Sequence, residues 1–121
     1  MKILVAYSDE IGREKIGQAL GFLGGHKTHI VQDMKTGLEM YKKNEFDAVV
    51  AGDMYGVNGF EFAKKIREYE NLAGKKSYIL VICRNAFEPD FTDDLSVAND
   101  FFAGPIAVRE VLKKINSLGE L

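Results

Sequence analysis

Five short runs of apolar residues alternate along the chain with stretches whose apolar positions recur at helical spacing. Residues 3–7, 48–51 and 78–83 are continuous apolar runs, which are typical of strands that are covered on both faces. Residues 28–31 are more mixed and predict an edge strand, and residues 101–103 predict a short last strand. Strands that are buried on both faces indicate a layered α/β fold.

Four other stretches carry apolar stripes that predict amphipathic helices. Glycines at 24–25 and at 74 end the first and the third of them, and Asp33 is placed to cap the second. Residues 88–99 are the weakest helix prediction, because apolar positions are sparse there and Pro89 fixes the start. The four stripes are Ile16, Ala19, Leu20 and Leu23; Met34, Leu38 and Tyr41; Phe62, Ala63, Ile66 and Tyr69; and Val108, Val111, Leu112 and Ile115.

Strand and helix alternate five times within 121 residues. Neighbouring parallel strands need a crossover helix between them, and such crossovers are right-handed. Five of these units that do not close a barrel predict an α/β fold, a single doubly wound (βα)5 domain over residues 1–121 with helices on both faces of the sheet. A ligand site in such a domain is expected beyond the carboxyl ends of the strands.

The composition excludes several classes of protein. Hydrophobic residues make up 46% and charged residues 28%, as in an ordinary globular domain. The net charge of -2 gives no general attraction for nucleic acid or an anionic membrane. The single cysteine, Cys83, cannot form an internal disulfide and fits a reducing compartment. With no signal peptide and no apolar run long enough to span a membrane, the chain is expected to be soluble and cytoplasmic.

Three segments taken together resemble the CheY-like receiver domain of response regulators. They are residues 2–6, residues 51–59 (Ala-Gly-Asp-Met-Tyr-Gly-Val-Asn-Gly) and residues 101–105 (Phe-Phe-Ala-Gly-Pro), and they keep the order and nearly the spacing of the family. The resemblance covers the whole chain. It implies a five-stranded parallel sheet of order 2-1-3-4-5, the flavodoxin-like or CheY-like topology, and a role in two-component (phosphorelay) signal transduction.

A working receiver resembles a small magnesium-dependent phosphotransferase that acts on itself. An acidic pair after the first strand holds Mg²⁺, and an aspartate at the end of the third strand takes the phosphoryl group. A Thr or Ser ends the fourth strand, and a lysine precedes a proline after the fifth. The chemistry requires these types, because Mg²⁺ prefers hard oxygen ligands and phosphoryl transfer is mostly positioning and charge neutralisation.

This chain departs from that pattern at four strand ends. The acidic pair falls on Tyr7 and Ser8, with Asp9 one place late. Counting back from Met54, Tyr55 and Gly59 puts the acceptor at Ala51, and counting forward from Phe46-Asp47 puts it at Gly52. Neither side chain can accept a phosphoryl group. The degenerate pocket that we predict comprises Tyr7, Ser8, Asp9, Ala51, Gly52, Asp53, Cys83 at the hydroxyl position and Gly104 at the lysine position.

Two positions near the fifth strand follow from the same resemblance. Gly104-Pro105 matches the Lys-Pro of receivers, whose peptide bond is usually cis, and we therefore predict a cis bond before Pro105. Phe101 matches the aromatic switch position of the family. A phenylalanine has no hydroxyl to favour an outward position, so an inward ring is the cheaper state, with a plain core aromatic as the alternative.

Five acids without a base lie between residues 88 and 100. The resemblance places them on the face formed by the fourth helix, the fifth strand and the fifth helix, which receivers use for partners. One interpretation is a docking patch for a basic protein, and the other is a solvated segment. The acids assigned to this partner face are Asp90, Asp93 and Asp94.

Three hypotheses follow, and we favour the first. In this hypothesis the chain is an atypical pseudo-receiver, is not an enzyme and uses no cofactor. It binds a protein partner without phosphorylation, and the partner can be a second copy of the chain. The second is a working receiver that is phosphorylated on the displaced Asp53 with Mg²⁺. Asp9 and Asp53 are then the weak candidates for metal ligands, and no other metal site is predicted. The third is a flavodoxin-type cofactor binder, which needs a phosphate-cradling loop where residues 8–12 present two carboxylates.

Overall fold

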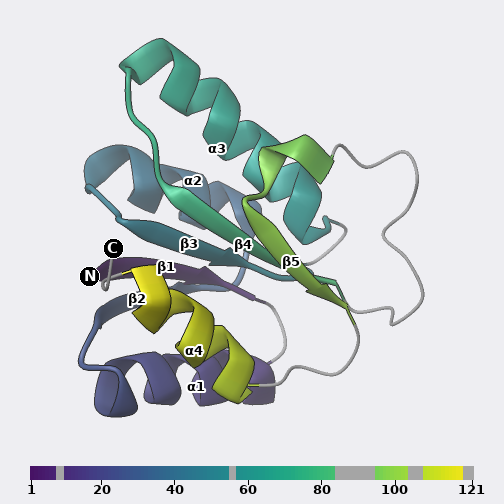
Figure 1. The fold of residues 1–121 in the computed structure, drawn as a ribbon. Coiled ribbons are helices and arrows are strands. Elements are labelled where there is room, and N and C mark those ends of the chain that lie inside the picture. Colours follow the sequence, from purple (N-terminus) through teal and green to yellow (C-terminus); the bar gives the residue numbers. More distant parts are fainter. Residues whose placement is uncertain (8–9, 55–56, 84–94, 104–107, 119–121) are drawn as a thin grey trace.

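Five parallel strands form a single sheet in the order β2-β1-β3-β4-β5 (Figure 1). The computed structural model describes residues 1–7, 10–54, 57–83, 95–103 and 108–118. The order confirms the predicted doubly wound α/β fold and its 2-1-3-4-5 topology. The strands are β1 (Lys2–Ala6), β2 (Lys27–Val31), β3 (Ala48–Ala51), β4 (Tyr78–Cys83) and β5 (Asp100–Ala103).

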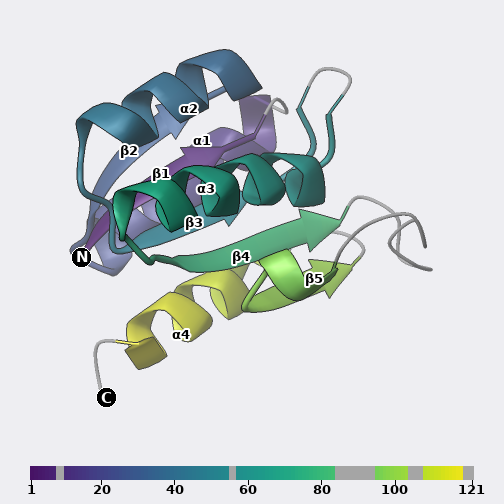
Figure 2. The same cartoon turned by 90° about the horizontal axis from the view of Figure 1, so that it is seen from above.

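Helices cover both faces of this sheet (Figures 1 and 2). Helices α2 and α3 lie on one face, where side chains such as Phe62 and Ile66 pack on Leu4 and Val49. Helices α1 and α4 lie on the other, around a second core cluster. The helices are α1 (Glu10–Gln18), its continuation η1 (Ala19–Leu23), α2 (Met34–Lys43), α3 (Gly59–Ala73), the short η2 (Leu95–Val97) and α4 (Val108–Leu118).

The predicted helix ends are present. Asp33 caps α2 by accepting a hydrogen bond of 2.8 Å from the backbone N–H of Thr36. Gly74 ends α3 with a φ of 71°, a left-handed conformation that a glycine adopts without strain. Asn58 caps the start of α3 in the same way as Asp33 caps α2, although the sequence reading did not assign it.

The first helix changes character after Gln18. Residues Ala19–Leu23 form a π-helical turn, in which the N–H of Gly24 donates to the carbonyl of Ala19 at 2.9 Å. The helix stops at the predicted glycines, and Gly25 has a φ of 68°. The π-helical turn itself was not predicted, because one inserted residue changes the apolar spacing very little.

The helix predicted over residues 88–99 is wrong in the part that the structure describes. Residues 95–97 form a three-residue 3₁₀ turn, and Asn99 has left the helix. The backbone N–H of Asn99 donates to the carbonyl of Ile79, and its side-chain oxygen accepts from the N–H of Ile79. These two bonds extend the pairing of β4 with β5, so the segment joins the sheet earlier than predicted.

None of the described helices is both long and apolar enough to cross a membrane.

Candidate functional site

The ends of β1 and β3 lie side by side at the carboxyl edge of the sheet, where the sequence places the pocket. Ala6 pairs with Ala51 in the parallel ladder, so the next residues of the two strands, Tyr7 and Gly52, are neighbours. The N–H of Gly52 donates to the carbonyl of Ala6 at 2.8 Å. The structure therefore brings the first acidic-pair position and one candidate acceptor position together.

The ring of Tyr7 fills the space in front of Gly52. A β-carbon placed on Gly52 would overlap Cδ2 and Cε2 of Tyr7 and would lie 3.1 Å from its Cγ. Tyr7 is only 8% exposed and belongs to the core cluster beneath α1 and α4, which includes Val5 and Ile82. An apolar ring thus occupies the place where any side chain at position 52 would have to lie.

Ala51 points to the opposite face of the sheet. It is fully buried in the α2–α3 cluster with Ala6, Met54 and Phe60. Successive side chains of a strand alternate between faces, so Ala51 cannot share a pocket with Tyr7, whereas Gly52 does. Of the two acceptor positions left open by the sequence, Gly52 is the one beside Tyr7.

Asp53 lies half-buried between two buried residues, Gly52 and Met54. After it the chain turns back on itself, with the N–H of Met54 donating to the carbonyl of Val57 at 2.7 Å and the reverse bond at 2.9 Å. Met54 is 4% exposed and packs into the α2–α3 cluster. This anchored turn fixes the position of Asp53 just beyond the end of β3.

Of the other predicted pocket residues, the structure describes the backbone of Cys83. Cys83 ends β4, and its backbone pairs with Ala103 of β5. The remaining positions, including the predicted cis bond, lie outside the described residues. They are Ser8, Asp9, Gly104 and Pro105, together with the partner-face acids Asp90, Asp93 and Asp94.

The described residues at this edge do not fit Mg²⁺. The ion prefers several hard oxygen ligands in octahedral array. Here the first ligand position carries the buried ring of Tyr7, and Gly52 has no side chain. Within the described ranges, no group of three His, Cys, Asp or Glu side chains could hold a metal ion.

The ring of Phe101 is partly exposed and partly in contact with the core. It is 37% exposed and meets the buried ring of Phe60 edge-on, with 5.8 Å between ring centroids. The next residue, Phe102, packs against the α1–α4 cluster instead. Phe101 is partly exposed because β5 is the last strand of the sheet, so its side chains are covered from fewer directions.

A second polar cluster lies at the opposite end of the sheet, between α2, α3 and the start of β4. Glu70 is 3% exposed, and one of its oxygens accepts hydrogen bonds from the hydroxyl of Tyr41 at 2.5 Å and from the N–H of Ser77 at 2.7 Å. Its other oxygen accepts from the guanidinium of Arg67 at 2.6 Å. A buried carboxylate with this many donors is well satisfied.

Burial and hydrogen bonding set the pKa values of this cluster. Burial raises the pKa of Tyr41 to about 12, and the hydrogen bond to Glu70 acts in the same direction. Burial also raises the pKa of Glu70, but the bonds from Tyr41, Arg67 and Ser77 together outweigh it and leave a net lowering. Glu70 is therefore an ionised structural anchor. Glu70 was not predicted as a site residue, although its spacing of four residues from Ile66 places it on the buried face of α3.

The fold is that of the CheY-like receiver domains, as comparison with solved structures shows. Chemotaxis response regulator CheY4 of Vibrio cholerae is 21% identical over 97% of each chain, with a TM-score of 0.80. The receiver domain of a sensor histidine kinase from Pseudomonas aeruginosa, solved with magnesium in its active site cleft, is 22% identical over 96% of this chain and 94% of its own, with a TM-score of 0.80. A chain from the complex of histidine kinase ThkA with response regulator TrrA of Thermotoga maritima is 19% identical over 97% of each chain, with a TM-score of 0.77.

The likeness lies in the structure rather than in the sequence. No family model matches the sequence, and no curated protein matches it either. Identities of about one residue in five over nearly the whole length establish a shared fold and leave the chemistry of the site to be argued from its own residues.

Proposed function

We propose that this chain is a receiver-like domain of two-component signalling which binds a protein partner and is not phosphorylated. The single observation that carries the proposal is the contact of Tyr7 with Gly52. Where a receiver's acceptor aspartate would need room, this chain has a glycine, and an aromatic ring from β1 fills the space. The absence of a carboxylate at position 52 would by itself be weak support. A buried ring in the space where that side chain would lie supports the proposal more strongly, because the site then serves core packing.

The same residues argue against catalysis. Phosphoryl transfer depends on positioned charge, and the described part of this edge offers the half-buried Asp53 beside apolar neighbours. We therefore propose that the chain is not an enzyme and has no magnesium requirement. This pocket acts as packing that holds β1 against β3.

A protein is the partner that the fold favours. One structural neighbour comes from a complex between a histidine kinase and a response regulator, so this architecture can serve as a docking module. The partner face that we predicted includes β5, whose Phe101 is 37% exposed. A partly exposed aromatic is a common anchor in protein interfaces, and this supports β5 as part of the contact surface.

The test is an intact-mass measurement after incubation with Mg²⁺ and a small phosphodonor such as acetyl phosphate. We expect no adduct of about 80 Da, the mass of an added HPO₃ group. A functional receiver domain treated in parallel is the positive control. An adduct of that mass on the wild-type chain would overturn the proposal.

The experiment also addresses the alternative acceptor. If an adduct forms, the variant Asp53→Ala decides where it is: its disappearance would establish Asp53 as a displaced acceptor. The matched control is Asp47→Ala, because Asp47 lies at the opposite end of the sheet, where its carboxylate accepts from the N–H of Lys2. An adduct that persists in Asp53→Ala would lie on another residue, and Asp9→Ala would then test the other carboxylate of the predicted pocket.

A further inference from the structure

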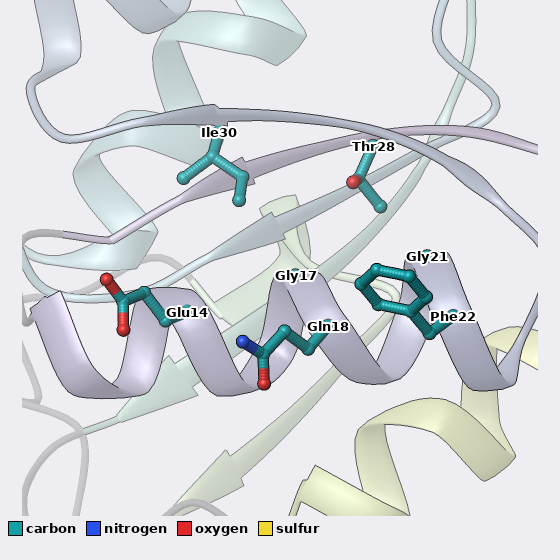
Figure 3. Close-up of a pocket in the computed structure, with 7 residues that line it drawn as sticks. All are labelled: Glu14, Gly17, Gln18, Gly21, Phe22, Thr28 and Ile30. Carbon is teal, nitrogen blue, oxygen red and sulfur yellow. The ribbon is translucent and has the colours of Figure 1, made fainter.

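A groove runs along the outer side of β2, between this strand and the first helix (Figure 3). Its volume is about 470 Å³, and glycines of the helix form its floor beside the side chains of Thr28 and Ile30. A β-carbon on Gly17 would lie 2.5 Å from Cδ1 of Ile30, so the glycine lets the Ile30 side chain lie close against the helix. The lining residues are Glu14, Gly17, Gln18, Gly21, Phe22, Thr28 and Ile30.

Two large apolar side chains on this groove are exposed. Phe22, on the π-helical turn, is 87% exposed, and Ile30 is 44% exposed. π-Helical turns occur frequently at functional sites, and exposed apolar residues around a groove mark an interaction surface. This surface therefore combines the groove with two exposed apolar side chains, Phe22 and Ile30.

The strand beside the groove has an open hydrogen-bonding edge. β2 is the outermost strand on its side, and within the described residues only β1 pairs with it. The N–H of Lys27 and the carbonyl of Val31 both bond toward β1. Because backbone groups alternate in direction along a parallel strand, Thr28 and Ile30 direct their N–H and C=O groups outward. An unpaired edge of this kind is a template for another strand.

We propose that this edge pairs with the β2 edge of a second copy of the chain, so that two sheets join into one across a two-fold axis. Such an interface is isologous, and it requires a surface that complements itself when the strand runs antiparallel to its own copy. An antiparallel pair forms hydrogen bonds only where outward-facing residues lie opposite each other. This leaves registers such as Ile30 opposite Ile30 or Thr28 opposite Ile30.

Charge selects among these registers. With Ile30 at the axis, the exposed Lys27 lies across from Asp33 of the second copy, which comes two residues after the end of β2 and still has extended backbone. The same pair recurs on the other side of the axis. The register that pairs Thr28 with Ile30 would instead place Lys27 opposite the buried Val31, so this ion pair would not form. The Ile30 register also brings the two exposed Ile30 side chains together on the groove side, where they cover apolar surface that is open in one copy. The occupant of the groove is therefore a second copy of this chain.

Sedimentation velocity of the full chain over a range of concentrations tests the proposal. We expect a reversible monomer–dimer equilibrium. In Ile30→Glu, two carboxylates would meet at the axis in place of two apolar side chains, so the dimer dissociation constant should rise by about a hundredfold. The matched control is Leu72→Glu, since Leu72 is 91% exposed on α3 over the other face of the sheet. A monomer at all concentrations, or an Ile30→Glu variant that dimerises like wild type, would overturn the proposal.

Cysteine cross-linking checks the register itself. In a Cys83→Ser background, Ile30→Cys should form a disulfide-linked dimer under mild oxidation by oxidised glutathione, because directly opposed residues have Cα atoms within bonding range. Thr28→Cys should not, since its two copies would lie about 14 Å apart along the strands, beyond the roughly 7 Å limit. Equal cross-linking of both variants would contradict the Ile30 register. These residues are remote from Tyr7 and Gly52, so the mass measurement above and the association measurement can fail independently.

Discussion

Tyr7 and Gly52 occupy one space at the carboxyl end of the sheet, the tyrosine supplying a ring and the glycine leaving room for it. The two residues are 45 positions apart in the sequence and become neighbours only through the pairing of β1 with β3. Each makes the other necessary: a ring at position 7 requires a glycine at position 52, and a side chain at 52 requires a smaller residue at 7.

This dependence predicts a strong coupling between the two positions. Gly52→Ala should lower the free energy of unfolding by about 1–3 kcal/mol, because the added methyl group overpacks the site. In a Tyr7→Val background the same change should have a much smaller effect, since the ring has gone. Urea unfolding of the four chains measures the cycle. Gly21→Ala is the control, as the nearest atom to its new β-carbon would be at 3.8 Å, and its effect should be small. Equal effects of Gly52→Ala in both backgrounds would rule out the coupling.

Glu70 predicts a loss of stability in acid. Its pKa in the folded chain lies below the ordinary 4.5, because the bonds from Tyr41, Arg67 and Ser77 outweigh the effect of burial. The unfolded chain therefore binds the proton more readily, and stability that is present above about pH 4.5 is lost as the pH falls through the folded pKa. Urea unfolding at several pH values should show this loss in wild type and a shallower one in Glu70→Gln. Parallel curves for the two chains would contradict the assignment.

Arg67 predicts a stability effect that its charge alone does not explain. Its guanidinium donates to Glu70, to the carbonyls of Ser77 and Val97, and to the side chain of Asn99, so one planar group ties α3 to η2 and β5. Arg67→Lys keeps the charge but not the fork, and we expect unfolding to become easier by about 1–3 kcal/mol. Lys65→Met, which removes an exposed pair with Glu68 at 3.8 Å, should change stability little. If Arg67→Lys left the free energy of unfolding unchanged, the positive charge alone would account for the stabilisation by Arg67.

His29 predicts a second pH dependence, at higher pH. Its Nε2 is buried without a hydrogen-bond partner in the described part of the chain, and its ring meets Phe46 edge-on at 5.4 Å. Burial, and then the positive charges of Lys2 and Lys27, lower the pKa of His29 below 6.5. The folded chain thus binds this proton less readily than the unfolded chain, so stability decreases as the pH falls below about 6.5. In His29→Phe, the midpoint temperature of thermal unfolding should decrease less between pH 6.5 and 5 than it does in wild type. Glu70→Gln serves as the comparison, because its effect belongs to the lower pH range.

Much of the fold was open to prediction from the sequence. Continuous apolar runs such as residues 48–51 and 78–83 can be satisfied only by strands that are covered on both faces. The capping role of Asp33 and the left-handed end of α3 at Gly74 are local properties, which depend on a few bonds within one turn. Over residues 95–99 the predicted helix was wrong, because Asn99 bonds to Ile79 on another strand, a contact that local propensity does not contain.

The sequence by itself determined which residues stand where the receiver pattern has its acidic groups: Ala51 or Gly52 at the acceptor position, and Tyr7 at the first acidic position. Only the tertiary structure decided that Gly52 rather than Ala51 lies beside Tyr7, and that the ring fills the space in front of Gly52. The buried bonds of Glu70 and the exposed edge of β2 with its groove were likewise decided there. The physical reason is the same in each case. Residue identity fixes what a side chain can do, whereas strand pairing and the alternation of faces fix what it meets.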